Sequence, residues 1–113
     1  MDFLHQNLAN GRWFQLSLAE QMGNIGSEIG RAVIYLKRGE KERMNMAMER
    51  AFDLFDLTIG DKRWHARGAL REILRAKEIC AEVFYGRENY GYAPEDLDKY
   101  FMQYALAARK EVN

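Results

Sequence analysis

Residues 17–39 read SLAEQMGNIGSEIGRAVIYLKRG and carry the clearest helical signal in the chain. Ser17 and Glu20 have the spacing of a capping box, in which each side chain bonds to the backbone N–H of the other residue. Apolar residues then recur every three or four positions, as they do along the seam of a packed helix. These seam residues are Leu18, Met22, Ile25, Ile29, Ala32 and Leu36. Because Gly39 can adopt the left-handed conformation that commonly ends a helix, the stretch predicts a helix from residue 18 to residue 37 or 38.

Three further segments show the same periodicity and are separated by turn residues. We expect helices over residues 41–59 and 64–85, and a last helix that begins at Pro94, because proline suits the first turn of a helix. Short connections make consecutive helices antiparallel neighbours, so the sequence predicts an all-α, up–down antiparallel bundle of about four helices. Residues 1–16 form either a short extra helix or an arm docked on the bundle. The chain of 113 residues is expected to be one domain.

The composition limits the classes of partner. Lys plus Arg and Asp plus Glu both count 17, so the formal net charge is zero, whereas a dedicated nucleic-acid-binding domain is usually strongly basic. A net charge near zero also favours self-association. No apolar run approaches the length of a membrane span, and the single cysteine cannot form an internal disulfide. We therefore expect a cytoplasmic protein with no membrane partner.

Three glycines lie inside the first predicted helix, where each costs about 1 kcal/mol relative to alanine. Gly23, Gly26 and Gly30 follow one another at spacings of three and four residues, beside the apolar seam. Another interaction must offset their cost. The favoured interpretation is a smooth groove on which a second helix approaches closely, and the alternative is a ligand or partner that lies on the exposed backbone.

A polar row runs beside the apolar seam of the same helix. The row consists of Gln21, Asn24, Glu28, Arg31 and Tyr35, and its first four members are the candidate pocket residues. These side chains would line a polar pocket in the bundle, with Glu28 as a working carboxylate, or they form only the polar boundary of the helix. A hairpin that turns at Gly39 brings Glu28 to the height of Arg50. An ion pair between these two residues would explain Glu28 without any chemistry.

Basic residues gather around the start of the third predicted helix. They are Lys62, Arg63, His65, Arg67, Arg71, Arg75 and Lys77, and the candidate contact residues among them are Lys62, Arg63, Arg67, Arg71 and Arg75. Arg67, Arg71 and Arg75 are four residues apart, so they stack on one face and repel one another by roughly 0.2–0.5 kcal/mol per pair. The favoured interpretation is a ladder of ion pairs with the second helix, and the predicted pairs are Asp56 with Arg67, Asp53 with Arg71 and Glu49 with Arg75. The alternative is a surface that binds RNA or phosphate, with Trp64 or Tyr85 available to stack on bases.

The sequence contains no recognisable catalytic, metal or cofactor motif. Its two histidines, His5 and His65, lack the spacing of a zinc or di-iron site. Cys80 lies on the apolar stripe of the third helix and is expected to be a core residue rather than a nucleophile. Neither a phosphate-binding glycine loop nor a nucleophile elbow occurs. We therefore predict no metal and no cofactor, and we favour a binding protein over an enzyme.

Four stretches carry a resemblance to a known group of proteins. They are LAEQMGNIGSE (18–28), AFDLFDLTI (51–59), LREIL (70–74) and YFMQYALAAR (100–109). Through them the chain resembles a group of small prokaryotic helical-bundle proteins of no assigned function, so the resemblance implies the fold and no activity. In size and architecture alone it is also similar to HEPN domains, which work with RNA or nucleotidyltransferases. It lacks the Arg-x4–6-His motif of HEPN ribonucleases, because no arginine has that spacing from either histidine.

Three functional hypotheses follow from these patterns. The leading one is a non-enzymatic bundle that acts through self-association or a protein partner, because the net charge is zero and no catalytic set is assembled. The second is an RNA- or nucleotide-linked accessory protein that uses the basic residues from Lys62 to Arg75. The third is a small enzyme with a polar pocket around Glu28.

Overall fold

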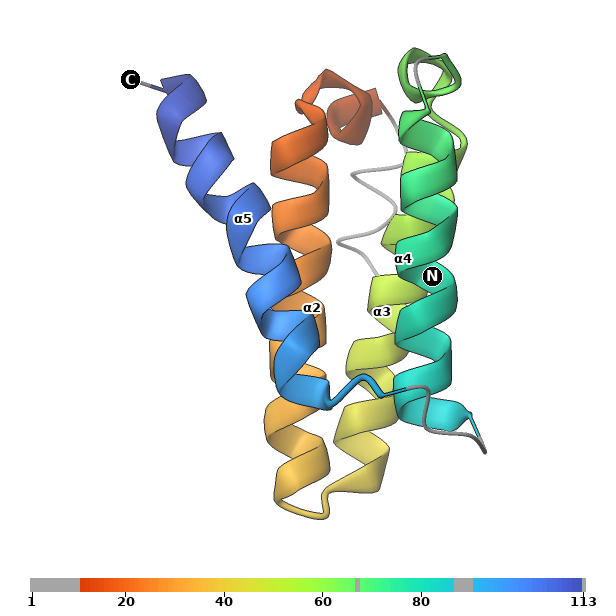
Figure 1. The fold of residues 1–113 in the computed structure, drawn as a ribbon, viewed down its shortest axis with the longest axis vertical. Coiled ribbons are helices and arrows are strands. Elements are labelled where there is room, and N and C mark those ends of the chain that lie inside the picture. Colours follow the sequence, from red (N-terminus) through yellow and green to blue (C-terminus); the bar gives the residue numbers. More distant parts are fainter. Residues whose placement is uncertain (1–10, 67, 87–90, 113) are drawn as a thin grey trace.

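The computed structural model describes residues 11–66, 68–86 and 91–112. Its long helices are α2 (Leu18–Lys37), α3 (Lys41–Ile59), α4 (Ala69–Tyr85) and α5 (Pro94–Val112). Two single-turn 3-10 helices, η2 (Trp13–Gln15) and η3 (Lys62–Trp64), precede α2 and α4. The long helices form an all-α, up–down antiparallel bundle (Figure 1), which confirms the predicted fold class.

The start and end of α2 agree with the sequence pattern. Ser17 Oγ accepts the N–H of Glu20 at 3.1 Å, and the Ser17 N–H donates to the Glu20 carboxylate at 3.0 Å. Gly39 follows the helix with a φ of +72°. Four seam residues are fully buried, namely Met22, Ile25, Ile29 and Ala32. Leu36 is 38% exposed instead, because the α2–α3 hairpin projects beyond the ends of α4 and α5 (Figure 1).

The segment before α2 is only partly described, since residues 1–10 lie outside the described range. Of the short helix or arm expected over residues 1–16, the structure contains the single turn of η2. Trp13 is buried in the core, and its Nε1 donates to Thr58 Oγ1 at 3.1 Å. This hydrogen bond joins the segment to the last turn of α3.

The four helices are not packed equally against one another. α2 packs along α3 on one side and along α5 on the other, whereas α4 packs mainly against α3. Figure 1 shows that α5 leans away from α4 toward its C-terminal end. The side of the bundle between α4 and α5 is therefore the least closed.

The glycines of α2 form the surface on which α5 lies. A Cβ atom added to Gly26 would come within 2.5 Å of the Phe101 Cβ, and one added to Gly23 would lie 3.7 Å from the Ala105 Cα. Gly30 also faces α5. The prediction of a groove for a closely approaching helix is confirmed, because α5 occupies it.

The predicted start of the third helix was wrong. We expected this helix to begin at Trp64, but α4 begins five residues later, at Ala69. Trp64 instead ends η3, whose N-terminal cap is Asp61. Gly68 then adopts a φ of +78°, in the left-handed region, which separates η3 from α4. The connection between α3 and α4 is therefore longer than a tight hairpin.

Candidate functional site

The polar row of α2 does not converge on one pocket. Glu28 binds Arg31 at 2.8 Å and Arg50 at 2.9 Å, so the predicted pair between Glu28 and Arg50 is confirmed. Asn24 turns back to its own helix and donates to the Glu20 carbonyl at 2.8 Å. The carboxylate of Glu28 is thus held between two guanidinium groups, without help from Asn24.

Gln21 belongs to a separate polar cluster near the N-terminal end of α2. Its side chain is fully buried, and its Nε2 donates both to the Trp13 carbonyl and to Asp61 Oδ2, at 3.0 Å each. Its Oε1 accepts the indole N–H of Trp64 at 2.8 Å. The cluster ties η2, α2 and η3 together, because its members come from all three elements.

Asp61 is the centre of this cluster, and the sequence analysis did not identify it. Arg63 binds its carboxylate at 2.7 Å, and the same guanidinium lies 4.4 Å from the Trp64 ring centroid. The hydrogen bond from Arg63 lowers the pKa of Asp61; burial acts against this effect, and the hydrogen bond from Gln21 supports it. The sequence signal was an aspartate two residues before an arginine, which is too common to single out.

The predicted ladder of ion pairs is not formed in the described residues. Asp56 binds Lys77 at 2.7 Å, and its expected partner, Arg67, lies outside the described range. Arg71 and Arg75 have no ion pair within the described part of the chain, so the pairs predicted for them were wrong. The pair between Asp56 and Lys77 shows that α3 and α4 meet in a different register from the one expected, so Arg71 and Arg75 do not meet their expected partners.

The basic residues consequently have different surroundings. The side chain of Arg63 is 40% exposed, but its guanidinium binds Asp61 and donates to the Leu16 carbonyl, at 2.7 Å each. Lys62, Arg71 and Arg75 have exposed side chains. Of the basic residues predicted to contact RNA or phosphate, these three are exposed and have no ion pair within the described residues.

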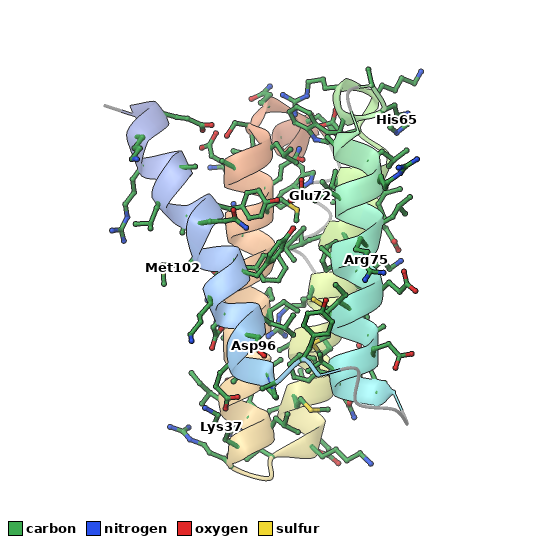
Figure 2. The ribbon with its side chains drawn as sticks, viewed as in Figure 1. Lys37, His65, Glu72, Arg75, Asp96 and Met102 are labelled. Carbon is green, nitrogen blue, oxygen red and sulfur yellow. The ribbon has the colours of Figure 1, made fainter. Side chains whose placement is uncertain are left out.

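An apolar cavity of about 210 Å³ lies between α4 and α5. Apolar and aromatic side chains dominate its wall, and they include Ala76, Ile79, Tyr92, Leu97, Tyr100 and Phe101. Figure 2 shows Glu72 and Arg75 of α4 and Asp96 of α5 around this cavity, and Met102 on the opposite side of α5. A second hollow of about 320 Å³ continues along α4, where Glu78 and Glu82 are part of its wall.

Two tyrosines bridge the two helices at one end of the cavity. The hydroxyls of Tyr100 and Tyr104 donate to Glu72 Oε1 at 3.1 Å and 2.6 Å, and they lie 3.2 Å from each other. Burial raises the pKa of Tyr100 to about 12. Burial and the hydrogen bond to Glu72 also raise the pKa of Tyr104. Both tyrosines therefore stay protonated at neutral pH and act as hydrogen-bond donors.

Cys80 is buried in the core, as predicted. Burial raises the pKa of its thiol to about 12, so the nucleophilic thiolate is not populated at neutral pH. In the described residues, no group of three or more His, Cys, Asp or Glu side chains could hold a metal ion. None of the described helices is both long enough and apolar enough to cross a membrane.

Comparisons of the chain with protein families, with curated proteins and with solved structures found no match. The site is therefore interpreted from its own geometry. The cavity between α4 and α5, with the charged residues on its border, is the feature that departs most from a closed four-helix bundle.

Proposed function

We propose that this protein is a non-enzymatic helical bundle that acts by association with a protein partner, a second copy of itself included. The observation that carries the proposal is the apolar cavity of about 210 Å³ between α4 and α5. A closed bundle would bury this surface. An apolar hollow bordered by charged side chains is instead typical of a site that accepts an apolar side chain from a partner.

An exposed aromatic side chain in the wall of the cavity supports the same proposal. Tyr92, which is part of the wall of both hollows, is 41% exposed. A partner that buries such a side chain removes apolar surface from water, which favours association. The surface on and beside α4 thus offers a complex both a hollow and apolar contact area.

The residues considered for chemistry have structural roles in this proposal. Glu28 serves as the common partner of Arg31 and Arg50. Cys80 is a buried thiol with a raised pKa. These arrangements favour a binding protein over the small enzyme considered from the sequence.

The proposal is tested by photo-crosslinking at a single position. Ile79, which lines both hollows, is replaced by p-benzoylphenylalanine, and the same replacement at the exposed Met46 of α3 provides the control. We expect a discrete covalent adduct from position 79 and none from position 46. Adducts of equal intensity at both positions, or no adduct at position 79, would reject this surface.

An RNA-linked accessory function is the second candidate. One observation favours it: Lys62, Arg71 and Arg75 are exposed, and none of them has an ion pair within the described residues. Binding to a mixed RNA pool should then weaken steeply as the salt concentration rises, because bound cations release counterions from the phosphates. Binding that is absent, or unchanged when Arg71 and Arg75 are both replaced by glutamine, would rule this candidate out.

A further inference from the structure

Four charged residues form an ordered row along α4; three of them are exposed, and Glu82 is half-buried. The row consists of Arg71, Arg75, Glu78 and Glu82. At 3.6 residues per turn, all four fall within an arc of about 60° around the helix axis. None of them has an ion pair within the described part of the chain. The row therefore has two unpaired cations toward the start of the helix and two unpaired anions toward its end.

This order of charges is complementary to itself. Arg75 and Glu78 are separated by about 4.5 Å along the axis, and Arg71 and Glu82 by about 16 Å, at a rise of 1.5 Å per residue. Both pairs have the same midpoint, between residues 76 and 77. A two-fold axis through this midpoint, perpendicular to α4, would place each arginine of one copy opposite a glutamate of the other copy.

We propose that the partner is a second copy of this chain, docked through an antiparallel α4–α4 contact. Arg71 of each copy faces Glu82 of the other, and Arg75 of each copy faces Glu78 of the other. This inference rests on the proposed function, because it names the partner of the same surface. Each contact is formed twice in the dimer, as two-fold symmetry requires.

The hollows beside α4 fit this arrangement. The hollow of about 320 Å³ has Glu78 and Glu82 in its wall, so it can receive the arginine side chains of the second copy. The apolar cavity adjoins this hollow, because both are lined by Arg75, Ile79 and Tyr92. Antiparallel docking places the second copy over both, so the dimer would cover the apolar surface that the monomer leaves accessible.

Reversal of charges tests the symmetry directly. One variant combines Glu78→Lys with Glu82→Lys, and the other combines Arg71→Glu with Arg75→Glu. Each variant makes the row uniform in sign, so two identical copies repel each other. We expect the wild-type chain to have twice its monomer mass of 13.2 kDa in analytical ultracentrifugation at low salt, and each variant alone to be monomeric.

The decisive result comes from mixing the two monomeric variants. In an equimolar mixture every facing pair again has opposite charges, so we expect a heterodimer, and we expect its dissociation constant to rise at least tenfold at high salt. The variant with all four reversals should dimerise like the wild-type chain. Far-UV circular dichroism checks that each variant is folded, and the double reversal Arg109→Glu with Lys110→Glu on α5 should leave the dimer intact.

A wild-type chain that stays monomeric, or a mixture of the two variants that stays monomeric, would overturn the dimer. The crosslinking experiment separates this failure from that of the proposed function. An adduct between position 79 and a different protein would agree with association through this surface, but it would reject a second copy of the chain as the partner. The absence of any adduct at position 79 rejects both the dimer and the proposed function.

Discussion

Phe101 lies directly on the backbone of Gly26, so close that a Cβ atom on this glycine would come within 2.5 Å of the Phe101 Cβ. The ring of Phe101 also packs edge-on against Tyr100 and Phe55, at centroid distances of 5.1 Å and 6.3 Å. The missing side chain at position 26 therefore lets α5 reach the centre of the core. The close packing offsets the cost of about 1 kcal/mol that glycine imposes on a helix interior.

The same substitution at two glycines of α2 should have effects of opposite sign. Gly26→Ala forces α5 away, because the Phe101 Cβ is tied to its backbone, and should lower the free energy of unfolding by about 1–3 kcal/mol. Gly23→Ala places its Cβ in ordinary contact, 3.7 Å from the Ala105 Cα, and should raise stability by about 0.5–1 kcal/mol. Urea denaturation followed by circular dichroism measures both. Equal shifts in the same direction would contradict the close packing of α5 on Gly26.

The fold of α2 could be predicted because its signals are local. The capping box at Ser17, the seam spacing and the left-handed residue Gly39 all lie within one stretch. The tight turn also determined the pairing of Glu28 with Arg50, since a short hairpin leaves little freedom in register. The α3–α4 register could not be predicted in the same way, because it depends on η3 and on the conformation of Gly68.

Glu28→Gln should lower the free energy of unfolding by about 1–3 kcal/mol, because it leaves the partly buried Arg50 without its anion. The matched control is Asp56→Asn, which removes an ion pair to Lys77 in which the aspartate side chain is 64% exposed. This control should cost less than about 1 kcal/mol. Urea midpoints of the two variants are compared at neutral pH. A larger loss of unfolding free energy for Asp56→Asn than for Glu28→Gln would contradict the expectation that the more buried ion pair contributes more stability.

Asp61 should contribute to the acid sensitivity of the fold. Its pKa in the folded protein lies below the ordinary value of 3.8, chiefly because of the hydrogen bond from Arg63. Its contribution to stability is therefore complete above that value and is lost as the pH falls through the lower, folded pKa. Urea midpoints measured from pH 6 down to pH 2 should fall less steeply in Asp61→Asn than in the wild-type chain. Identical slopes would show that the pKa of Asp61 is not lowered.

Tyr100 and Tyr104 should ionise late in an alkaline titration. Both have a raised pKa, and burial is the largest cause in each case. The stability that they contribute is present below the ordinary tyrosine value of 10.0 and is lost as the pH rises toward the folded values. Tyrosinate absorbance of the variant with Tyr100→Phe and Tyr104→Phe should lack the late part of the wild-type titration. If the late rise in absorbance kept its size in this variant, it would come from residues other than Tyr100 and Tyr104.

The candidate site itself was beyond the reach of the sequence pattern. Tyr100 follows the same helical spacing as the buried Phe101 and Leu97, so the pattern alone places it in a core. Whether it faces α2 or α4 depends on the tilt of α5, which the glycines of α2 determine. The charges of α4 are visible in the sequence. Their lack of partners in the described residues became apparent only once the register of α3 and α4 was known.

The groove on α2 also has a consequence for the order of events during synthesis. The helix that supplies Gly26 leaves the ribosome well before the helix that supplies Phe101, because the two residues are far apart in the chain. Until the later segment emerges, the glycine face of α2 has no other long helix of the described chain to cover it. The nascent polypeptide therefore completes its core late, and a chaperone that shields apolar surface would have its longest opportunity to bind in that interval.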